Sequence, residues 1–371
     1  MRTSPLTAAC LLALAACGPY QAPLPPSPPA DTLPPPRVAP SGASLQEQKS
    51  KVLGRLQAVS AVNEKVVWAS GTGGSFTVTT NGGASWRSGV VAGADSLEFR
   101  DVHGVDEKTA YLLSSGNGTA SRIYKTTDAG QNWQLQFINR DSTAFYDCFA
   151  FWDPLAGIAF SDNVGGTFPV RVTTDGGLDW HLLSDPANPG KSPVPAATSG
   201  EGAFAASGTC VATVGKNAAY IATGAGTRSR ILFTPDRGRT WSSFDTPMVQ
   251  GSATTGHTGI AFRDAQVGVA VGGDIGDARR ATERVIITAN GGRSWAAGGQ
   301  PTFAGPAYGV AYVPGARGTV VAVGPGGASV SRDDGRTWAA LDSLSYWSVT
   351  FASARAGWMV GPTGRITRVA F

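Results

Sequence analysis

Short runs of alternating apolar and polar residues dominate the chain, and a clear example lies at residues 75–79. There Phe76 and Val78 are apolar, whereas Ser75, Thr77 and Thr79 are polar. Alternation with a period of two predicts a β-strand with one buried face. Amphipathic runs at helical spacing are hard to find outside residues 45–57, so the pattern predicts an all-β protein.

A motif of eight residues follows this strand and recurs six times. Its tryptophans are separated by 43 to 61 residues, a period typical of propeller blades. The third, fifth and eighth positions of the copies are Asn81, Gly83 and Trp86; Asp128, Gly130 and Trp133; Asp175, Gly177 and Trp180; Asp236, Gly238 and Trp241; Asn290, Gly292 and Trp295; and Asp333, Gly335 and Trp338.

Each position of the motif has a structural explanation. An Asp or Asn side chain at the third position can accept hydrogen bonds from backbone N–H groups two residues on. Gly at the fifth position can adopt the positive φ of a tight hairpin, and Trp at the eighth can be buried where blades meet. We therefore expect the carboxylates to stabilise turns rather than to catalyse a reaction.

The six motifs require at least six blades. Residues 346–371 contain three further strand-like runs without a motif, and the chain stops where a fourth strand would begin. Residues of about 48–57 could supply that strand from the other end of the chain, which would close the ring and remove exposed sheet edges. We predict seven blades, with six as the alternative.

The motif resembles the Asp-box, or bacterial-neuraminidase repeat, S/T-x-D-x-G-x-T/S-W. Asn81 and Asn290 replace its Asp, and Asn132 and Asp179 replace its Thr or Ser. Residues 261–273 and 350–364 also resemble repeats of the photosystem II stability/assembly factor-like proteins. Over residues 50–371 the resemblance implies a β-propeller, and this branch suggests chaperoning or scaffolding of envelope or membrane proteins. Bacterial relatives are often labelled oxidoreductase or glycosyl hydrolase.

The first residues have the features of a targeting signal. Arg2 is followed by an apolar run at residues 6–16, which is shorter than a membrane-spanning helix. Residues 14–17, Leu-Ala-Ala-Cys, resemble a bacterial lipobox, which implies a signal peptide at 1–16 and a lipidated Cys17. The residue after this cysteine is Gly18 and not Asp, which by the same resemblance implies that the lipoprotein is sorted to the outer membrane. The protein would then lie in the periplasm or at the cell surface. An ordinary signal peptide cut nearby is the alternative.

Two further segments complete the domain organisation. Residues 17–44 are Pro-rich and predict an extended tether behind the lipid anchor, and residues 45–371 form the propeller. Cys10 leaves with the signal peptide, so Cys148 and Cys210 remain in an exported, oxidising setting. Either a disulfide or two buried thiols fits the sequence, because sequence contains no Cβ distance.

The innermost strand of each blade lines the central channel of a propeller. Aligning these strands places Gln57, Arg100, Asp147, Thr258, Tyr308 and Trp347 near one end of the channel, with Tyr146, Glu201 and His257 close by in sequence. Loops at a propeller mouth can converge on one ligand, so this set is the candidate ligand site. Long insertions at residues 185–195 and 273–283 could project from one rim to bind a partner.

Two functions from different classes fit this site. The first is a non-catalytic scaffold that binds a protein or glycan of the envelope. The second is a glycoside hydrolase or sialidase-like enzyme that uses Asp147, Glu201 and a channel tyrosine, since glycosidases need two carboxylates. The Arg-Ile-Pro of sialidases is missing; Gly54-Arg55-Leu56 is the nearest stretch. We favour binding.

Other chemistries lack support in the sequence. No Gly-x-Gly-x-x-Gly follows a strand and opens a helix, and no Cys-x-x-Cys occurs. His103, His181 and His257 are scattered, so we expect no metal and no cofactor. The net charge of +4 is mild, and no aromatic-basic stripe suggests nucleic acid. We expect a monomer.

Overall fold

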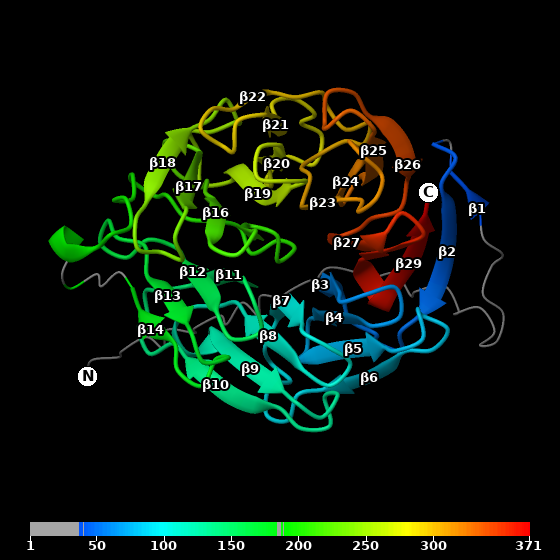
Figure 1. Cartoon of the computed structure of the whole chain (residues 1–371), viewed down its shortest axis with the longest axis horizontal. Helices are drawn as coiled ribbons and strands as arrows, with labels where there is room; N and C mark the ends of the chain where they lie inside the picture. The colour runs from blue at the N-terminus through cyan, green and yellow to red at the C-terminus, as the bar shows by residue number, and fades with distance from the viewer. Residues whose placement is uncertain (1–36, 40, 184–186, 188) are drawn as a thin grey trace, which may run out of the picture. The chain divides into compact units, whose positions relative to one another are not determined.

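The structure is a computed structural model that describes residues 37–371 except 40, 184–186 and 188. Seven antiparallel sheets surround a central channel and form a seven-bladed β-propeller (Figure 1). The predicted all-β fold and the predicted number of blades are confirmed. The signal peptide, Cys17 and most of the Pro-rich tether lie outside the described residues. In the part of the chain that is described, no helix is long and apolar enough to cross a membrane.

Blades 1 to 6 each contain four consecutive strands, with the first innermost. Blade 1 contains β3 Leu56–Ala61, β4 Val67–Gly71, β5 Ser75–Thr79 and β6 Arg87–Val90, and blade 2 contains β7 Phe99–Gly104, β8 Ala110–Ser114, β9 Arg122–Thr126 and β10 Gln134–Ile138. Blade 3 contains β11 Tyr146–Phe151, β12 Gly157–Ser161, β13 Val170–Thr173 and β14 His181–Leu182, and blade 4 contains β15 Val211–Val214, β16 Ala218–Ala222, β17 Arg230–Thr234 and β18 Ser242–Asp245. Blade 5 contains β19 Thr255–Phe262, β20 Gly268–Asp274, β21 Val285–Thr288 and β22 Ala296–Ala297, and blade 6 contains β23 Gly309–Tyr312, β24 Val320–Gly324, β25 Gly327–Ser331 and β26 Ala339–Asp342. Single 3₁₀ turns occur at Gly118–Ala120, Pro189–Lys191 and Pro362–Gly364.

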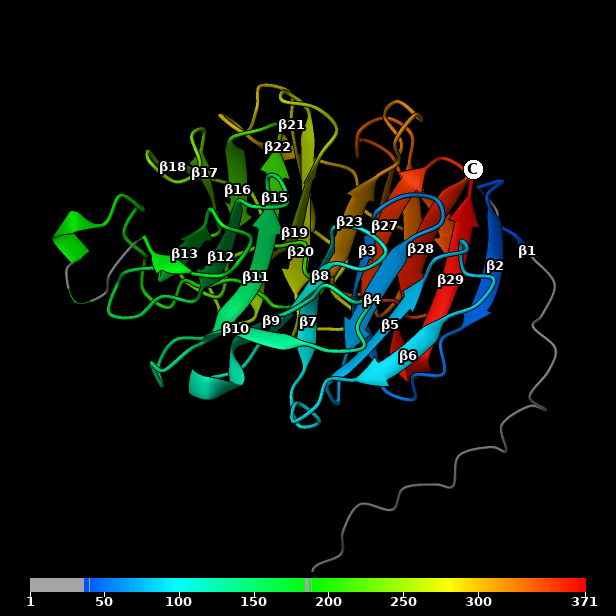
Figure 2. The ribbon, with the colours of Figure 1, turned by 60° about the horizontal axis from the view of Figure 1, so that its bottom comes forward.

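Blade 7 joins the two ends of the propeller. β27 Ser348–Ser353, β28 Ala356–Val360 and β29 Arg365–Ala370 come from the end of the chain, and the fourth strand is β2 Ser44–Lys49. All six residues of β2 pair with β29, and the two strands lie side by side in Figure 2. Closure by an N-terminal strand was therefore predicted correctly, but its position at about 48–57 was wrong. β1, Arg37–Val38, adds a short edge to β2 within the segment predicted as tether.

Apolar side chains on the two faces of each blade pack against the neighbouring blades. The described residues form seven hydrophobic clusters, and each cluster lies between two adjacent blades around the ring. Trp86 of blade 1 packs with Trp358 of blade 7, for example, and Trp133 of blade 2 stacks edge-on against Phe76 of blade 1 at 5.1 Å. Burial of both sheet faces explains why the second strand of most blades, such as β4, β8 and β28, is buried along its whole length.

The repeated motif joins the third and fourth strands of blades 1 to 6. In the first copy, Thr79 Oγ1 accepts from Gly83 N at 2.9 Å, and Asn81 Oδ1 accepts from Ser85 N at 2.9 Å. The same two bonds recur in the other five copies. The acidic or amide side chain thus caps an N–H four residues on, not two as predicted from turn chemistry.

The fourth and fifth positions of every motif have positive φ, at 70° and 88° for Gly82 and Gly83. Two successive left-handed residues reverse the chain tightly between the third and fourth strands. The motif tryptophans pack against the preceding blade, and Trp86, Trp180 and Trp295 are buried. The motif is therefore a joint within the ring and contributes nothing to the channel.

Candidate functional site

β-Bulges interrupt the innermost strands of four blades at residues that the alignment placed near the channel. The ladders of blades 1, 2 and 3 shift register at the second residue of the innermost strand, which is Gln57, Arg100 or Asp147. The ladder of blade 5 shifts at Thr258, the fourth residue of β19. A bulge re-aims a side chain and bends its strand. Tyr308 and Trp347 hold the corresponding places, immediately before β23 and β27.

One segment divides the channel into two spaces. The residues Gly202–Thr209, which we call the strap, precede β15 and reach the centre of the ring, where a green loop is visible in Figure 1. Ser207 Oγ donates to the carbonyl of Tyr308 at 2.7 Å, and Ser348 Oγ donates to the carbonyl of Ser207 at 2.8 Å. The strap thereby connects blade 4 to blades 6 and 7 across the channel.

The space on one side of the strap is the start mouth, where the innermost strands begin. It encloses about 210 Å³ and is lined by Arg55, Gln57, Arg100, Phe204, Ala205, Ala206, Ile275, Tyr308 and Trp347. Four of the nine candidate residues are therefore brought together here: Gln57, Arg100, Tyr308 and Trp347.

The start mouth combines two arginines with two aromatic rings. The guanidinium of Arg55 lies 4.8 Å from the ring centroid of Trp347, and the rings of Trp347 and Tyr308 are 5.2 Å apart. Arg100 pairs with Glu98 at 2.6 Å, whereas Arg55 is 3.9 Å from the same carboxylate. Two cations share one carboxylate, so this group carries a net positive charge.

Polar groups of the start mouth also have unused hydrogen-bonding capacity. Gln57 is buried, and among the described residues its Oε1 has no hydrogen-bond partner; the same is true of Arg55 Nε. Burial raises the pKa of Tyr308, with Arg55 acting in the opposite direction. Tyr308 is therefore a neutral hydroxyl near pH 7. Unsatisfied buried polar atoms cost free energy unless water or a ligand completes them.

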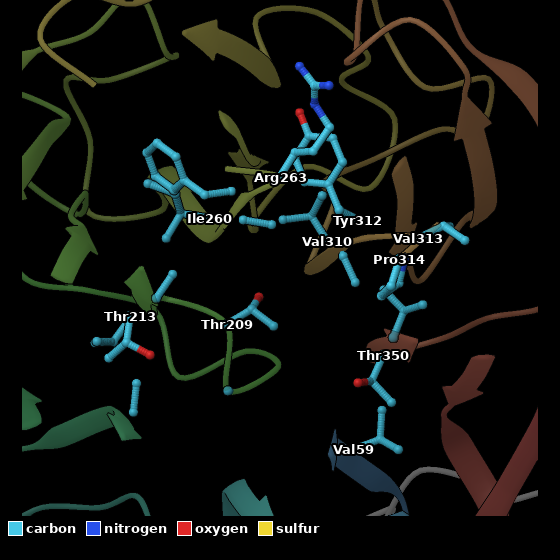
Figure 3. A pocket seen from close by; sticks show the side chains of 18 of the residues that line it. Val59, Thr209, Thr213, Ile260, Arg263, Val310, Tyr312, Val313, Pro314 and Thr350 are labelled. Atoms are coloured by element: carbon cyan, nitrogen blue, oxygen red, sulfur yellow. The ribbon is translucent and has the colours of Figure 1, made fainter. Parts of the chain in front are cut away.

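The space on the other side of the strap is the end cavity, of about 680 Å³. Val59, Val310 and Thr350 surround it together with Thr209 of the strap (Figure 3). Thr213 Oγ1 in this cavity donates to the carbonyl of Phe151 at 2.8 Å, whereas the hydroxyl of Tyr312 has no hydrogen-bond partner among the described residues.

The structure does not bring the other five candidate residues to the start mouth. Tyr146 points between blades 2 and 3, where Arg171 Nε donates to its hydroxyl at 2.9 Å. Thr258 is buried and donates to the carbonyls of Ala307 and Val271. Thr258 therefore does not line the start mouth.

Glu201 and His257 are parts of the scaffold behind the strap. Glu201 is fully buried and pairs with Arg230 at 2.6 Å. His257 Nδ1 lies 2.7 Å from the carbonyl of Thr223, which requires a proton on that nitrogen. Burial lowers the pKa of His257 to about 4, so the ring is neutral. Neither side chain can reach a ligand in the start mouth.

Asp147 is buried next to Asp162, and its Oδ2 has no hydrogen-bond partner among the described residues. Burial, followed by the charge of Asp162, raises the pKa of Asp147 well above its usual range. Asp147 and Glu201 therefore do not form a pair of accessible carboxylates, which a glycosidase requires on either side of its substrate. The described residues contain no group of three His, Cys, Asp or Glu side chains that could hold a metal ion.

The two cysteines of the propeller are bonded to each other. Cys148 follows Asp147 on β11, Cys210 follows the strap, and their Cα atoms are 6.0 Å apart. The sequence left the disulfide and the free thiols equally open. The disulfide fixes the end of the strap to blade 3.

Sequence reasoning missed Arg55, Ile275 and the strap. The interval of 61 residues between Trp180 and Trp241 is the available signal, but it predicts only an external loop at 185–195, which lies partly outside the described residues. The composition of residues 200–208, Gly-Glu-Gly-Ala-Phe-Ala-Ala-Ser-Gly, is also informative in retrospect. Small side chains allow a backbone to enter a narrow channel.

No family profile matches the sequence, and no curated protein sequence matches it either. Solved structures do match its fold. A structure of YCF48 bound to D1 peptide superposes with a TM-score of 0.61 at 13% identity, covering 88% of this chain and 97% of that one. YCF48 from Cyanidioschyzon merolae gives 0.59 at 16% identity, with 88% and 98% covered. The GH74 enzyme of Niastella koreensis gives 0.54 at 15% identity, with 86% and 53% covered. These similarities define a seven-bladed β-propeller.

Proposed function

We propose that this protein is a non-catalytic propeller that binds a polypeptide partner at the start mouth. The observation that carries the proposal is the combination of Arg55, Arg100, Tyr308 and Trp347 around one pocket. Arg, Tyr and Trp are the side chains that most often dominate protein interfaces, because they supply large contact area with a polar end. The bound peptide in the YCF48 structure supports a polypeptide rather than another ligand.

The environment of the protein is part of the same proposal. We infer that Cys17 is lipidated and that the propeller is an exported, monomeric lipoprotein of the envelope, in the outer membrane, whose partner is an envelope or membrane protein under assembly. The lipobox-like residues 14–17 and the Pro-rich residues that follow support this inference. The Asp-box resemblance of the motif supports a propeller of the assembly-factor type.

Site-specific photocrosslinking tests the binding site in the native envelope. A photoreactive phenylalanine analogue in place of Tyr308 should crosslink the full-length protein to one polypeptide. The matched control places the analogue at Leu178, which is exposed in the motif of blade 3, away from the channel. Adducts that are identical at both positions, or no adduct at Tyr308, would contradict the proposal. An adduct with a glycan would keep the site but change the class of partner.

The glycosidase alternative is tested separately with a panel of fluorogenic glycosides. We expect no turnover above that of a blank preparation. Turnover that disappears in Asp147→Asn would show an enzyme and would overturn the proposal. Turnover that survives in that variant would point to a contaminant.

A further inference from the structure

The start mouth has room for one large side chain. Its volume of about 210 Å³ corresponds to roughly seven water molecules at about 30 Å³ each. A helix with its side chains is about 10–12 Å wide and does not fit into such a space. Ala205 and Ala206 of the strap line the pocket with small side chains and leave this space free. A polypeptide partner therefore reaches the pocket with a single residue.

Four of the lining side chains are apolar or aromatic, namely Phe204, Ile275, Tyr308 and Trp347. Ile275 is 38% exposed, so a ligand that covers it gains free energy from apolar burial. The rings of Tyr308 and Trp347 are 5.2 Å apart and inclined at 57°. Aromatic rings pack favourably in offset or edge-to-face arrangements at centroid separations of about 4.5–7 Å. An aromatic side chain of the partner suits these surroundings.

Gln57 adds a buried amide whose oxygen has no partner among the described residues. The side chain is 2% exposed, it lines the start mouth, and its Oε1 accepts no hydrogen bond in the described part of the chain. The bulge between Leu56 and Ala58 leaves Gln57 out of register with β4. A buried polar atom without a partner costs free energy. A ligand that brings a hydrogen-bonding group to this amide removes that cost.

The charge of the start mouth narrows the choice of side chain. Arg55 and Arg100 lie 3.9 Å and 2.6 Å from the one carboxylate of Glu98, so the group is net positive. A lysine or arginine of the partner would be repelled. An aspartate or glutamate would suit the charge, but it would leave Ile275 and the aromatic rings uncovered. A neutral side chain with an apolar body and a polar tip satisfies both parts of the pocket.

The aromatic residues differ in what their tips offer to Gln57. Phenylalanine makes no hydrogen bond, and the indole of tryptophan only donates. The hydroxyl of tyrosine both donates and accepts. A primary amide presents an oxygen that accepts and a nitrogen that donates, so a tyrosine hydroxyl pairs with Gln57 whichever way the amide is turned.

We propose that the start mouth recognises a tyrosine side chain of the partner, an assignment that rests on the proposed binding of a polypeptide there. The tyrosine ring packs against Trp347 and Ile275, and its hydroxyl forms a hydrogen bond with the amide of Gln57. Gln57 therefore discriminates tyrosine from phenylalanine. Trp347 contributes to the binding of either ring, because it contacts the part that the two residues share.

Two uncharged tripeptides test this recognition on the full-length protein without its natural partner. N-acetyl-Gly-Tyr-Gly-amide and N-acetyl-Gly-Phe-Gly-amide differ only in the hydroxyl, and ligand-observed NMR titration gives both Kd values. We expect the tyrosine peptide to bind about tenfold more tightly, because the phenylalanine peptide buries the amide of Gln57 without a partner. Equal Kd values, or no binding of either peptide up to about 20 mM, would overturn the proposal.

Three variants locate the discrimination. Gln57→Leu should reduce the preference for tyrosine below about twofold by weakening only the tyrosine peptide, because leucine cannot bond to the hydroxyl. Trp347→Ala should weaken both peptides and keep the preference. Leu178→Ala, at an exposed residue in the motif of blade 3, should change neither Kd. A preference for tyrosine that survives in Gln57→Leu would rule out the assigned hydrogen bond and the proposal with it.

The stability of Gln57→Leu provides a second measurement. Its Tm should equal or exceed that of the wild type, since the substitution removes a buried amide oxygen that has no donor among the described residues. A clearly lower Tm would show that the amide is already satisfied within the protein, which would sink the idea. A polypeptide crosslinked at Tyr308 together with equal affinities for the two peptides would reject the tyrosine and leave the proposed function standing.

Discussion

Glu201 and Arg230 form a bidentate ion pair in the interior of the propeller. Arg230 Nε lies 2.9 Å from Oε1 and Nη2 lies 2.6 Å from Oε2, while the two side chains are 0% and 10% exposed. Thr198 and Thr223 donate further hydrogen bonds to the same carboxylate. A carboxylate satisfied so completely is a structural anchor for the chain that leads into the strap, not a catalytic acid.

Breaking this ion pair should destabilise the propeller strongly. In Arg230→Met the buried Glu201 loses its cation, and removal of one partner of a buried pair typically costs about 3–5 kcal/mol. Urea unfolding followed by tryptophan fluorescence measures the change in the free energy of unfolding. The matched control is Arg228→Met, because Arg228 pairs with Asp245 at 2.7 Å on the surface. That exposed pair should contribute less than about 1 kcal/mol. Equal losses in both variants would show that Glu201 is not held as described.

Gln48 should be needed for closure of the ring. Its Oε1 accepts from Trp86 Nε1 at 3.1 Å and from Trp358 Nε1 at 3.2 Å, and its Nε2 donates to the carbonyl of Gly82 at 3.2 Å. One side chain of the N-terminal strand thus connects blade 7 to blade 1. Gln48→Leu leaves two buried indole N–H groups without an acceptor, at about 1–3 kcal/mol each.

Thermal unfolding of the Gln48→Leu variant measures this loss, and a lower Tm is expected. Gln46→Leu on the same strand is the control, since Gln46 is only half-buried and should change the Tm little. A normal Tm for Gln48→Leu would mean that β2 closes the ring by its backbone pairing alone.

The regular parts of this architecture could be predicted from the sequence because they repeat. The motif ending at Trp86 and its five copies fix six hairpins, and the strand-like runs after residue 346 require a partner strand from elsewhere. The alignment also found Arg100 and Trp347, because equivalent strands present equivalent positions to the channel. Asp147 and Thr258 were aligned with these residues, yet both are buried and neither lines the start mouth.

The strap could not be predicted because it does not repeat. Its position depends on contacts with residues far away in the sequence, such as Ser207 with Tyr308 and Ser348, and no local pattern encodes them. The neighbour of Asp147 could not be predicted from the sequence either, because Asp162 lies in an irregular segment after β12. Irregular backbone of this kind is set by tertiary contacts rather than by local propensity.

Acid should weaken the fold through His257. The closed environment lowers its pKa to about 4 from an ordinary value of about 6.5, so the unfolded chain binds this proton more readily than the native protein. The stabilisation is complete above pH 6.5 and is lost progressively as pH falls through 4, up to about 3 kcal/mol. The free energy of unfolding measured from pH 7 to pH 4 should fall less steeply in His257→Gln. Parallel profiles would contradict this assignment of the tautomer and charge.

The lipid anchor predicts a simple modification experiment. Cells that express the full chain and are labelled with a palmitate analogue should yield a labelled protein that partitions into detergent. Cys17→Ser should abolish the label without changing the propeller, because Cys17 lies far in the sequence from residues 37–371. Cys10→Ser should keep the label, since the predicted cleavage site follows it. Label in Cys17→Ser, or none in the wild type, would exclude lipidation at this residue.

The affinity of the full-length protein for the polypeptide crosslinked at Tyr308 tests the central claim most directly. Isothermal titration of the purified pair should show that Trp347→Ala weakens binding at least tenfold, because the ring supports Arg55 and buries a large contact area at the start mouth. Leu178→Ala, on the outer part of blade 3, should leave the Kd within about twofold. An unchanged Kd in Trp347→Ala, or an equal loss in both variants, would show that the partner binds elsewhere on the propeller.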